Sequence, residues 1–250
     1  MKVKYIVFDL DDTLLNSERK VSDFSLSTLK KLQELGHFLI INTARSKMYA
    51  KEYIDLVNPD FSILNGGSLI IDKNQKAVYK NAISKEDTDK IVKQLMSISS
   101  TVSVQTEDIL YSSSEYKAQN AVVFDFGNDI FKEESFKILA CSECDDEIVK
   151  IAKENSLECV SYFGGAWKRL NALNASKWNG VLNLLNIING NIEDVITFGD
   201  DIGDLEMIEK APVGVLMKNA REEIKKDTIR ISKYTNNEDG VARFLIEYLL

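Results

Sequence analysis

The chain has 250 residues, of which 44% are hydrophobic and 28% are charged, and its net charge at pH 7 is −8. This length can hold one large domain or two modest ones with an ample core. The negative charge argues against nucleic acid or an anionic membrane as a main partner, because phosphate contacts need clustered Lys and Arg, and the basic residues here are scattered.

No apolar run approaches the roughly 20 residues of a membrane span, and Asp9 interrupts the first apolar run, so we expect neither a membrane helix nor a signal peptide. The three cysteines, an odd number, favour a cytoplasmic location. Cys141 and Cys144 have the C-x-x-C spacing of zinc or redox sites. A zinc site needs four ligands, and the only histidine, His37, is distant in the sequence, so we favour no role for this pair.

Apolar runs of strand length alternate with helical periodicity in the first part of the chain, which is typical of a parallel α/β sheet. The predicted elements are strands over 5–8, 38–41 and 61–64, a helix over about 26–35 ended by Gly36, and a helix capped by Ser46 that runs to about 57.

The pattern changes after about residue 82. Ser84 with Asp87 resembles a capping box and predicts a helix that runs to about residue 98. Shorter elements follow: strands over 102–105, 121–126, 137–140 and 158–162, with a helix over 145–155. We expect residues 83–172 to form a separate α+β module.

The first pattern then resumes. The predicted elements are a helix over 176–189 ended by Gly190, a strand over 195–198, a helix over 205–210, an edge strand over 212–216 and an amphipathic helix over 241–250. The sequence therefore predicts an α/β fold with a Rossmann-like, three-layer parallel sheet built from residues 1–82 plus 173–250.

Two acidic clusters directly follow apolar strands. The first is Asp9-Leu10-Asp11-Asp12-Thr13, and the second is Gly199-Asp200-Asp201-Ile202-Gly203-Asp204. Grouped negative charges repel each other unless a cation joins them. Oxygen ligands of this kind suit Mg²⁺, so we expect a magnesium site.

Four of the predicted strands end in polar residues, namely Asp9, Thr43, Asn65 and Asp200. In open α/β sheets, ligands bind beyond the carboxyl ends of the strands, so these four side chains face one site if their strands are parallel neighbours. Each residue alone is also a common helix cap, but their coincidence with two acidic clusters favours a site. Lys177 lies on the first turn of its helix, where the helix dipole disfavours a cation; nearby carboxylates or a phosphate would make it favourable.

These residues carry a family resemblance. Asp9-x-Asp11-x-Thr13, Thr43, Lys177 and the Asp200/Asp204 pair, in this order, resemble the four motifs of the haloacid dehalogenase-like (HAD) hydrolase superfamily. Further segments resemble its Cof-type phosphatases: Asn65-Gly66-Gly67, Ser176-Lys177, 213–220 and 237–242. The resemblance covers residues 5 to about 240. It implies a HAD-like core, with the 83–172 module as an inserted type IIB cap.

The resemblance also implies roles. Asp9 would attack the substrate phosphorus and form an aspartyl-phosphate, and Asp11 would protonate the leaving alkoxide and then activate water. Thr43, Lys177 and Leu10 would bind the phosphoryl group. Mg²⁺ would be held by Asp9, Asp200 and the main-chain oxygen of Asp11, and Asp204 would lie outside these ligands and orient Lys177 or a water.

The expected function is Mg²⁺-dependent hydrolysis of small phosphorylated metabolites such as sugar phosphates, because relatives that act on carbon–halogen bonds lack an acid at the position of Asp11. A phosphomutase of the same superfamily and a catalytically decayed phosphometabolite-binding protein are the alternatives. The sequence does not indicate the oligomeric state.

The chain departs from the family pattern at several positions. Asp12 stands where glycine is common, Gly203 where the Cof-type pattern has asparagine, and Asn174 and Trp178 replace glycines, which would reshape the pocket near the cap. Trp167, Lys168 and Arg169 could read a sugar or an anion, but we favour an amphipathic strand with solvated cations.

Overall fold

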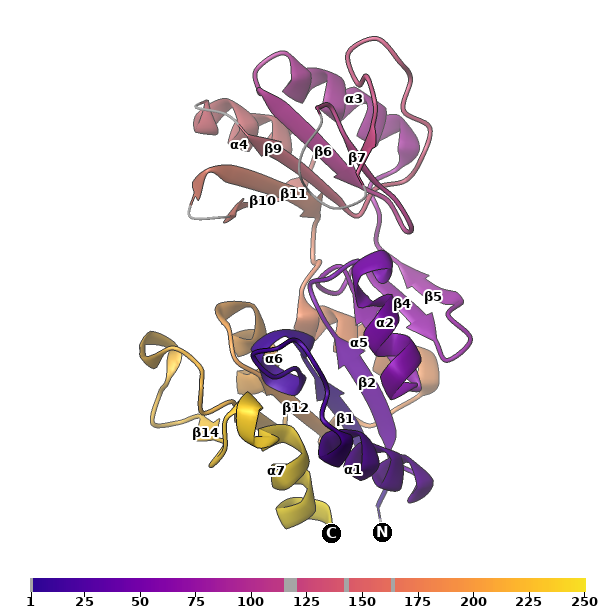
Figure 1. Ribbon diagram of the computed structural model, residues 1–250. Helices are drawn as coiled ribbons and strands as arrows, with labels where there is room; N and C mark the ends of the chain where they lie inside the picture. Colours follow the sequence, from indigo (N-terminus) through magenta and orange to yellow (C-terminus); the bar gives the residue numbers. More distant parts are fainter. Residues whose placement is uncertain (1, 115–120, 142–143, 163–164) are drawn as a thin grey trace. The chain divides into compact units, whose positions relative to one another are not determined.

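The computed structural model describes residues 2–114, 121–141, 144–162 and 165–250. The chain forms two compact units, each with its own internal contacts (Figure 1). The core unit comprises Met1–Arg45, Tyr49–Tyr79 and Ser176–Leu250. The insert unit comprises Ser46–Met48 and Lys80–Ala175.

The core unit is built on an eight-stranded sheet with the order β14-β13-β12-β1-β2-β3-β4-β5. The strands are β1 (Tyr5–Phe8), β2 (Phe38–Asn42), β3 (Phe61–Leu64), β4 (Leu69–Asp72), β5 (Ala77–Lys80), β12 (Val195–Gly199), β13 (Val213–Leu216) and β14 (Arg230–Ile231). The strands from β14 to β3 are parallel, and β4 is antiparallel to β3. The four strands that carry polar ends in the sequence, β12, β1, β2 and β3, are therefore parallel neighbours, and their carboxyl ends share one edge.

Helices cover both faces of this sheet. They are α1 (Asp23–Glu34), α2 (Lys47–Val57), α5 (Lys177–Ile188), α6 (Leu205–Lys210) and α7 (Gly240–Leu249). On one face, Trp178 of α5 and Met207 of α6 join a buried cluster with Val7 and Ile40 of the sheet. On the other face, the ring of Phe244 from α7 lies 5.4 Å from that of Phe198. The predicted three-layer α/β fold is confirmed.

The insert unit is an α+β layer structure. Its sheet has the order β10-β11-β9-β6-β7-β8. The strands are β6 (Thr101–Gln105), β7 (Leu110–Ser112), β8 (Val122–Val123), β9 (Lys137–Cys141), β10 (Leu157–Tyr162) and β11 (Trp167–Ala172), and the helices are α3 (Lys85–Met96) and α4 (Asp145–Glu154). Ile91 of α3 and Ile148 of α4 pack in one buried cluster with Val102, Ile138 and Leu170 of the sheet.

The sequence analysis missed four strands and misplaced others. Missing were β4, β5, β7 and β14, whose short or charge-bearing segments lack a clear apolar alternation. Of the strand predicted over 121–126, only Val122–Val123 pairs, with β7. The strand predicted at the edge, β13, lies inside the sheet because β14 pairs with its outer side.

Two predicted helix ends also differ in detail. Asn189, not Gly190, takes the left-handed conformation that ends α5, with φ of 50°. Ser46 precedes α2, but its buried hydroxyl has no hydrogen-bond partner among the described residues, so it does not cap the helix. The predicted caps of α3 and α5 are present: Ser84 Oγ accepts from Asp87 N, and Ser176 Oγ accepts from Asn179 N.

The start of α5 rests on a glycine in the turn between β3 and β4. Gly67 has φ of +104°, and a Cβ atom built there would lie 2.0 Å from the carbonyl oxygen of Ser176. Gly180, one turn into α5, would place a Cβ 3.0 Å from the Cα of Gly67. This close approach of two backbones sets the position of the first residue of α5, Lys177.

We expect Gly67→Ala to lower the free energy of unfolding by about 2–5 kcal/mol, because the left-handed conformation and the overpacking against Ser176 both cost free energy. Gly66→Ala is the matched control. Gly66 also has a positive φ, 68°, but a Cβ there meets no described atom within 4 Å, so only the conformational cost of about 1–2 kcal/mol applies. Urea denaturation measures both; equal losses would contradict the close packing of Gly67.

Candidate active site

Asp9 begins the site at the end of β1. Its backbone N–H donates to the carbonyl of Phe198 at 3.1 Å, so the residue is still held by the neighbouring strand β12. The chain then turns sharply through residues Leu10–Leu14, where Asp12 takes φ of 51°. Only 6% of Asp9 is exposed, which places its carboxylate in a region that water reaches poorly.

Lys177 bridges two buried carboxylates. Its Nζ lies 2.8 Å from Asp9 Oδ1 and 2.5 Å from Asp204 Oδ1. Burial alone would lower the pKa of Lys177, but the charges and hydrogen bonds of Asp204 and Asp9 raise it above its usual value. The lysine is therefore a fixed cation, and its carbonyl oxygen accepts a hydrogen bond from Asn42 Nδ2 at 3.0 Å, which ties α5 to the end of β2.

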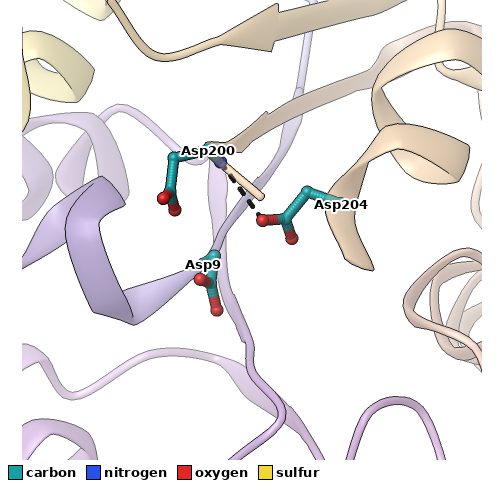
Figure 2. Close-up of side chains that lie close together, drawn as sticks. All are labelled: Asp9, Asp200 and Asp204. Atoms are coloured by element: carbon teal, nitrogen blue, oxygen red, sulfur yellow. Dashed lines mark hydrogen bonds between the residues drawn. The ribbon is translucent and has the colours of Figure 1, made fainter. Parts of the chain in front are cut away.

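Asp200 completes a group of three carboxylates. One oxygen each from Asp9, Asp200 and Asp204 lies within 4.8 Å of the others, and Figure 2 shows these side chains converging at the ends of β1 and β12. Thr13 Oγ1 donates to Asp200 Oδ1 at 2.8 Å, so Thr13 of the first acidic cluster orients the carboxylate of the second.

The electrostatics of this group suit a divalent cation. Burial raises the pKa of Asp200 to about 7, although the hydrogen bond from Thr13 opposes the shift. Burial also raises the pKa of Asp9, against the pull of Lys177. A cation between them would stabilise both carboxylates as anions. The carboxylate oxygens are hard ligands, so the residues present fit Mg²⁺ or a similar ion.

Asp204 differs from the other two because its oxygens are already used. Oδ1 accepts from Lys177, and Oδ2 accepts from the backbone N–H groups of Asp200, at 3.1 Å, and Asp201, at 3.2 Å. The dashed line in Figure 2 marks the bond from Asp200. With these donors in place, Asp204 holds the loop and the lysine, and Asp9 and Asp200 are left to ligate a cation.

Thr43 and Leu10 lie beside this group. Thr43 directly follows β2 and is 1% exposed. Its backbone N–H donates to the carbonyl of Ile63 at 2.9 Å, and its Oγ1 accepts from Arg45 N at 3.2 Å, so the hydroxyl proton can be donated to a ligand. The Leu10 amide hydrogen-bonds the Asp9 carboxylate and lowers its pKa, which places an N–H group at the nucleophile position. Asn65 follows β3, but neither polar atom of its buried amide has a partner among the described residues.

Asp11 is half-exposed and is held by Arg45, a residue that the sequence analysis did not assign to the site. Arg45 Nε and Nη2 donate to the two oxygens of Asp11 at 2.8 and 2.6 Å. Burial would raise the pKa of Asp11, but the hydrogen bonds and charge of Arg45 lower it. The carboxylate form, which can take a proton from water, is thereby favoured. The available signal was the position of Arg45, two residues beyond Thr43 at the same strand end.

The departures from the family pattern have simple structural accounts. Asp12 adopts a left-handed conformation that explains why glycine suits this position, and its side chain is exposed. A Cβ at Gly203 would meet no described atom within 4 Å, so the smaller residue is not required by packing. Trp178 lies in the buried cluster under the sheet, so our expectation that it reshapes a pocket is wrong. Asn174, with φ of 62°, replaces a glycine in a left-handed turn.

Two expectations for the insert unit can be compared with the structure. Trp167, Lys168 and Arg169 belong to strand β11, as expected, but Lys168 is not solvated: it is buried and pairs with Asp145 Oδ2 at 2.7 Å. Cys141 and Cys144 form no disulfide among the described residues, and the two residues between them, 142–143, lie outside the described residues. Among the described residues, the acidic group at Asp9 is the candidate metal cluster.

Comparisons with known proteins agree with this site. The profile of the haloacid dehalogenase-like hydrolases matches residues 6–245. The chain belongs to this family. It is 26% identical, over 97% of its length and 96% of the relative's, to the 5-amino-6-(5-phospho-D-ribitylamino)uracil phosphatase YitU of Bacillus subtilis.

Solved structures share the fold. A haloacid dehalogenase-like hydrolase from Bacteroides thetaiotaomicron superimposes with a TM-score of 0.83 at 23% identity, covering 99% of this chain and all of that one (100%). A subclass IIB sugar phosphatase of the superfamily superimposes with a TM-score of 0.75 at 19% identity, covering 98% and 99% of the two chains. The predicted family and enzyme class, a HAD phosphatase, are confirmed. Among the described residues, no helix is long and apolar enough to cross a membrane.

We expect Asp200→Asn to weaken Mg²⁺ binding by about 10-fold or more, because even partners outside the ligands change metal affinity by 10- to 100-fold. The measurement is the Mg²⁺ concentration dependence of the thermal unfolding midpoint, since a cation bound to the native state stabilises it. Asp12→Asn is the matched control, because it removes the same charge nearby at an exposed position whose φ of 51° suits asparagine. Equal effects of the two variants would contradict the assigned ligand set.

Proposed function

We propose that this protein hydrolyses small phosphomonoesters, such as sugar phosphates, with Mg²⁺ and through an aspartyl-phosphate on Asp9. The observation that carries the proposal is the buried Asp9 carboxylate, held 2.8 Å from the Lys177 ammonium at the end of β1. A carboxylate fixed in this way can attack an electrophile, while the adjacent cation stabilises the charge of a phosphoryl group.

Binding of the phosphoryl group falls to three groups around Asp9. Lys177 supplies a fixed positive charge, Thr43 supplies a hydroxyl donor at the end of β2, and the Leu10 amide supplies a backbone donor. Donors that are already held in position need no reorganisation when charge develops on the phosphoryl oxygens. Mg²⁺, when bound by Asp9, Asp200 and the main-chain oxygen of Asp11, would neutralise negative charge on the transferring phosphoryl group.

Proton transfer is assigned to Asp11. In the first step Asp9 attacks phosphorus, the bond to the leaving oxygen breaks, and Asp11 gives that oxygen a proton. In the second step the Asp11 carboxylate takes a proton from water, which attacks the aspartyl-phosphate, releases phosphate and restores Asp9. Asp11 must therefore carry a proton at the start of each turnover, against the preference that Arg45 gives to its carboxylate form, and it recovers that proton from water in the second step.

The remaining assignments follow from this function. Residues 1–82 plus 173–250 would form the catalytic core, and residues 83–172 would form a type IIB cap that excludes water and selects the leaving group. The name of the B. subtilis relative, a phosphatase of a phosphoribityl compound, supports a small phosphorylated metabolite as substrate. The absence of a disulfide among the described cysteines supports a cytoplasmic location.

We expect Asp9→Asn to abolish phosphate release, because a neutral amide is neither the nucleophile nor an anionic ligand. The assay measures phosphate released from a panel of phosphomonoesters with and without Mg²⁺. Substantial release by the variant would remove Asp9 as nucleophile. Turnover only after addition of a sugar bisphosphate would favour a phosphomutase, and binding without turnover across the panel would favour the decayed protein.

We expect Lys177→Ala to lower kcat by about 10²-fold or more, as for removal of a preorganised donor to the transition state. Loss of this cation also leaves Asp9 and Asp204 buried without their counter-charge, so the variant should unfold at a lower temperature. Lys210→Ala is a control, since Lys210 is an exposed lysine that pairs with Glu206 on the same helix, α6. Unchanged kinetics in Lys177→Ala would contradict the role of Lys177 in stabilising the transferring phosphoryl group.

A further inference from the structure

Arg45 makes the most extensive polar contact with the proposed acid–base residue. Its Nε donates to Asp11 Oδ2 at 2.8 Å and its Nη2 donates to Asp11 Oδ1 at 2.6 Å. This is the two-pronged geometry in which a planar guanidinium fixes both the position and the plane of a carboxylate. Arg19 and Lys177 act on Asp11 through their charges, without a fixed geometry of this kind.

Arg45 is the better anchored member of the pair. Its Nη1 donates to the carbonyl of Tyr49 at 3.0 Å, and its Cζ lies 4.8 Å from the centre of the Tyr53 ring. Tyr53 is itself buried, and its hydroxyl donates to the carbonyl of Arg19 at 3.1 Å. The Arg45 side chain is 18% exposed and that of Asp11 is 50% exposed. The arginine is therefore a fixed support, and the aspartate depends on it for its orientation.

The backbone of Arg45 links this support to the phosphate site. Its N–H donates to Thr43 Oγ1 at 3.2 Å, and its carbonyl accepts from Asn65 N at 2.9 Å. The loop after β2 therefore carries both a proposed phosphate donor, Thr43, and the side chain that holds Asp11. A phosphomonoester bound at Thr43 would meet an Asp11 whose carboxyl group is already aimed.

We propose that Arg45 is a positioning residue that aims the Asp11 carboxyl group at the leaving oxygen, and that it thereby equips the site for alkyl phosphates in particular. This inference rests on the proposed function. An alkoxide is a poor leaving group and needs a proton as the bond to phosphorus breaks, whereas an acidic phenol leaves without one. Arg45 keeps its own proton throughout, and the transferred proton moves from Asp11 to the leaving oxygen.

The test compares two substrates in Arg45→Gln and Arg45→Lys: ribose 5-phosphate, with an alkoxide leaving group, and p-nitrophenyl phosphate, with an acidic phenol. We expect the single-turnover rate of ribose release from ribose 5-phosphate to fall on the order of 10- to 100-fold in both variants. This loss is at or below the lower end of the roughly 10²- to 10⁴-fold that general acid catalysis contributes, because Asp11 itself is kept. Lysine keeps the positive charge but cannot make the two-pronged contact with Asp11, so Arg45→Lys should not restore the activity on ribose 5-phosphate. For p-nitrophenyl phosphate we expect the single-turnover rate of p-nitrophenol release to change by less than about 3-fold, near the limit at which independent effects are resolved. Single-turnover release reports the first step alone, whereas steady-state turnover also includes the second step, which needs Asp11 for both substrates.

A second set of variants separates positioning from folding. In an Asp11→Asn background, adding Arg45→Gln should cost less than about 2-fold, because residues that act through one group are not additive. Tyr53→Leu keeps both Arg45 and Asp11 but removes the aromatic ring against which the Arg45 guanidinium packs. We expect this variant to lose less activity than Arg45→Gln, and again more on ribose 5-phosphate than on p-nitrophenyl phosphate. Arg243→Gln is the matched control: this arginine lies over Phe24 and Tyr234 and donates to the Glu238 carbonyl, away from the site, so both activities should be kept.

Equal losses on the two substrates, or a further large loss when Arg45→Gln is added to Asp11→Asn, would overturn the positioning role. Rescue by Arg45→Lys would also overturn it, because charge alone would then suffice. The proposed function fails separately, through activity that survives in Asp9→Asn. The two failures are therefore distinguishable in one set of assays.

Discussion

The active centre depends on one buried ammonium group held between two buried carboxylates. Lys177 contacts Asp9 and Asp204 at 2.8 and 2.5 Å, and removing the lysine leaves both buried carboxylates without this counter-charge, which is strongly destabilising. Much of the surrounding structure serves to place this one side chain. Asn42 binds its carbonyl oxygen, Ser176 caps its helix, and Gly67 allows that helix to approach the sheet closely.

The balance of charge among these side chains explains why the group suits a bound cation. Three carboxylates, those of Asp9, Asp200 and Asp204, surround one ammonium, so two negative charges remain unmatched when all three are ionised. Burial raises the pKa of both Asp9 and Asp200, which is the response of an anionic group that lacks solvent and a counter-ion. A divalent cation would supply the two missing charges and would prepare the proposed centre to receive a phosphoryl group.

The sequence could predict those site residues whose place in the fold follows from their neighbours in the chain. Asp9, Thr43 and Asp200 could be grouped, because parallel strands end at one edge and each residue directly follows an apolar run. Arg45 could not, since nothing local indicates that its side chain reaches back 34 residues to Asp11. Lys168 looked like a solvated cation for the same reason: its burial depends on Asp145, on a different element. Short strands such as β4 and β14 lack the alternation that a pattern requires.

The turn that carries Asp9 and Asp11 is also fastened by the far end of the chain. Asn219 Nδ2 donates to the carbonyl of Asp12 at 2.7 Å, and Asn236 Nδ2 donates to that of Leu15 at 3.0 Å, across 207 and 221 residues. During synthesis from the N-terminus these contacts can form only after residues 219 and 236 have left the ribosome, whereas most of the insert unit lies in one earlier continuous stretch, Lys80–Ala175. The nascent chain can therefore complete the insert before it can fasten the turn that carries Asp9, the proposed nucleophile.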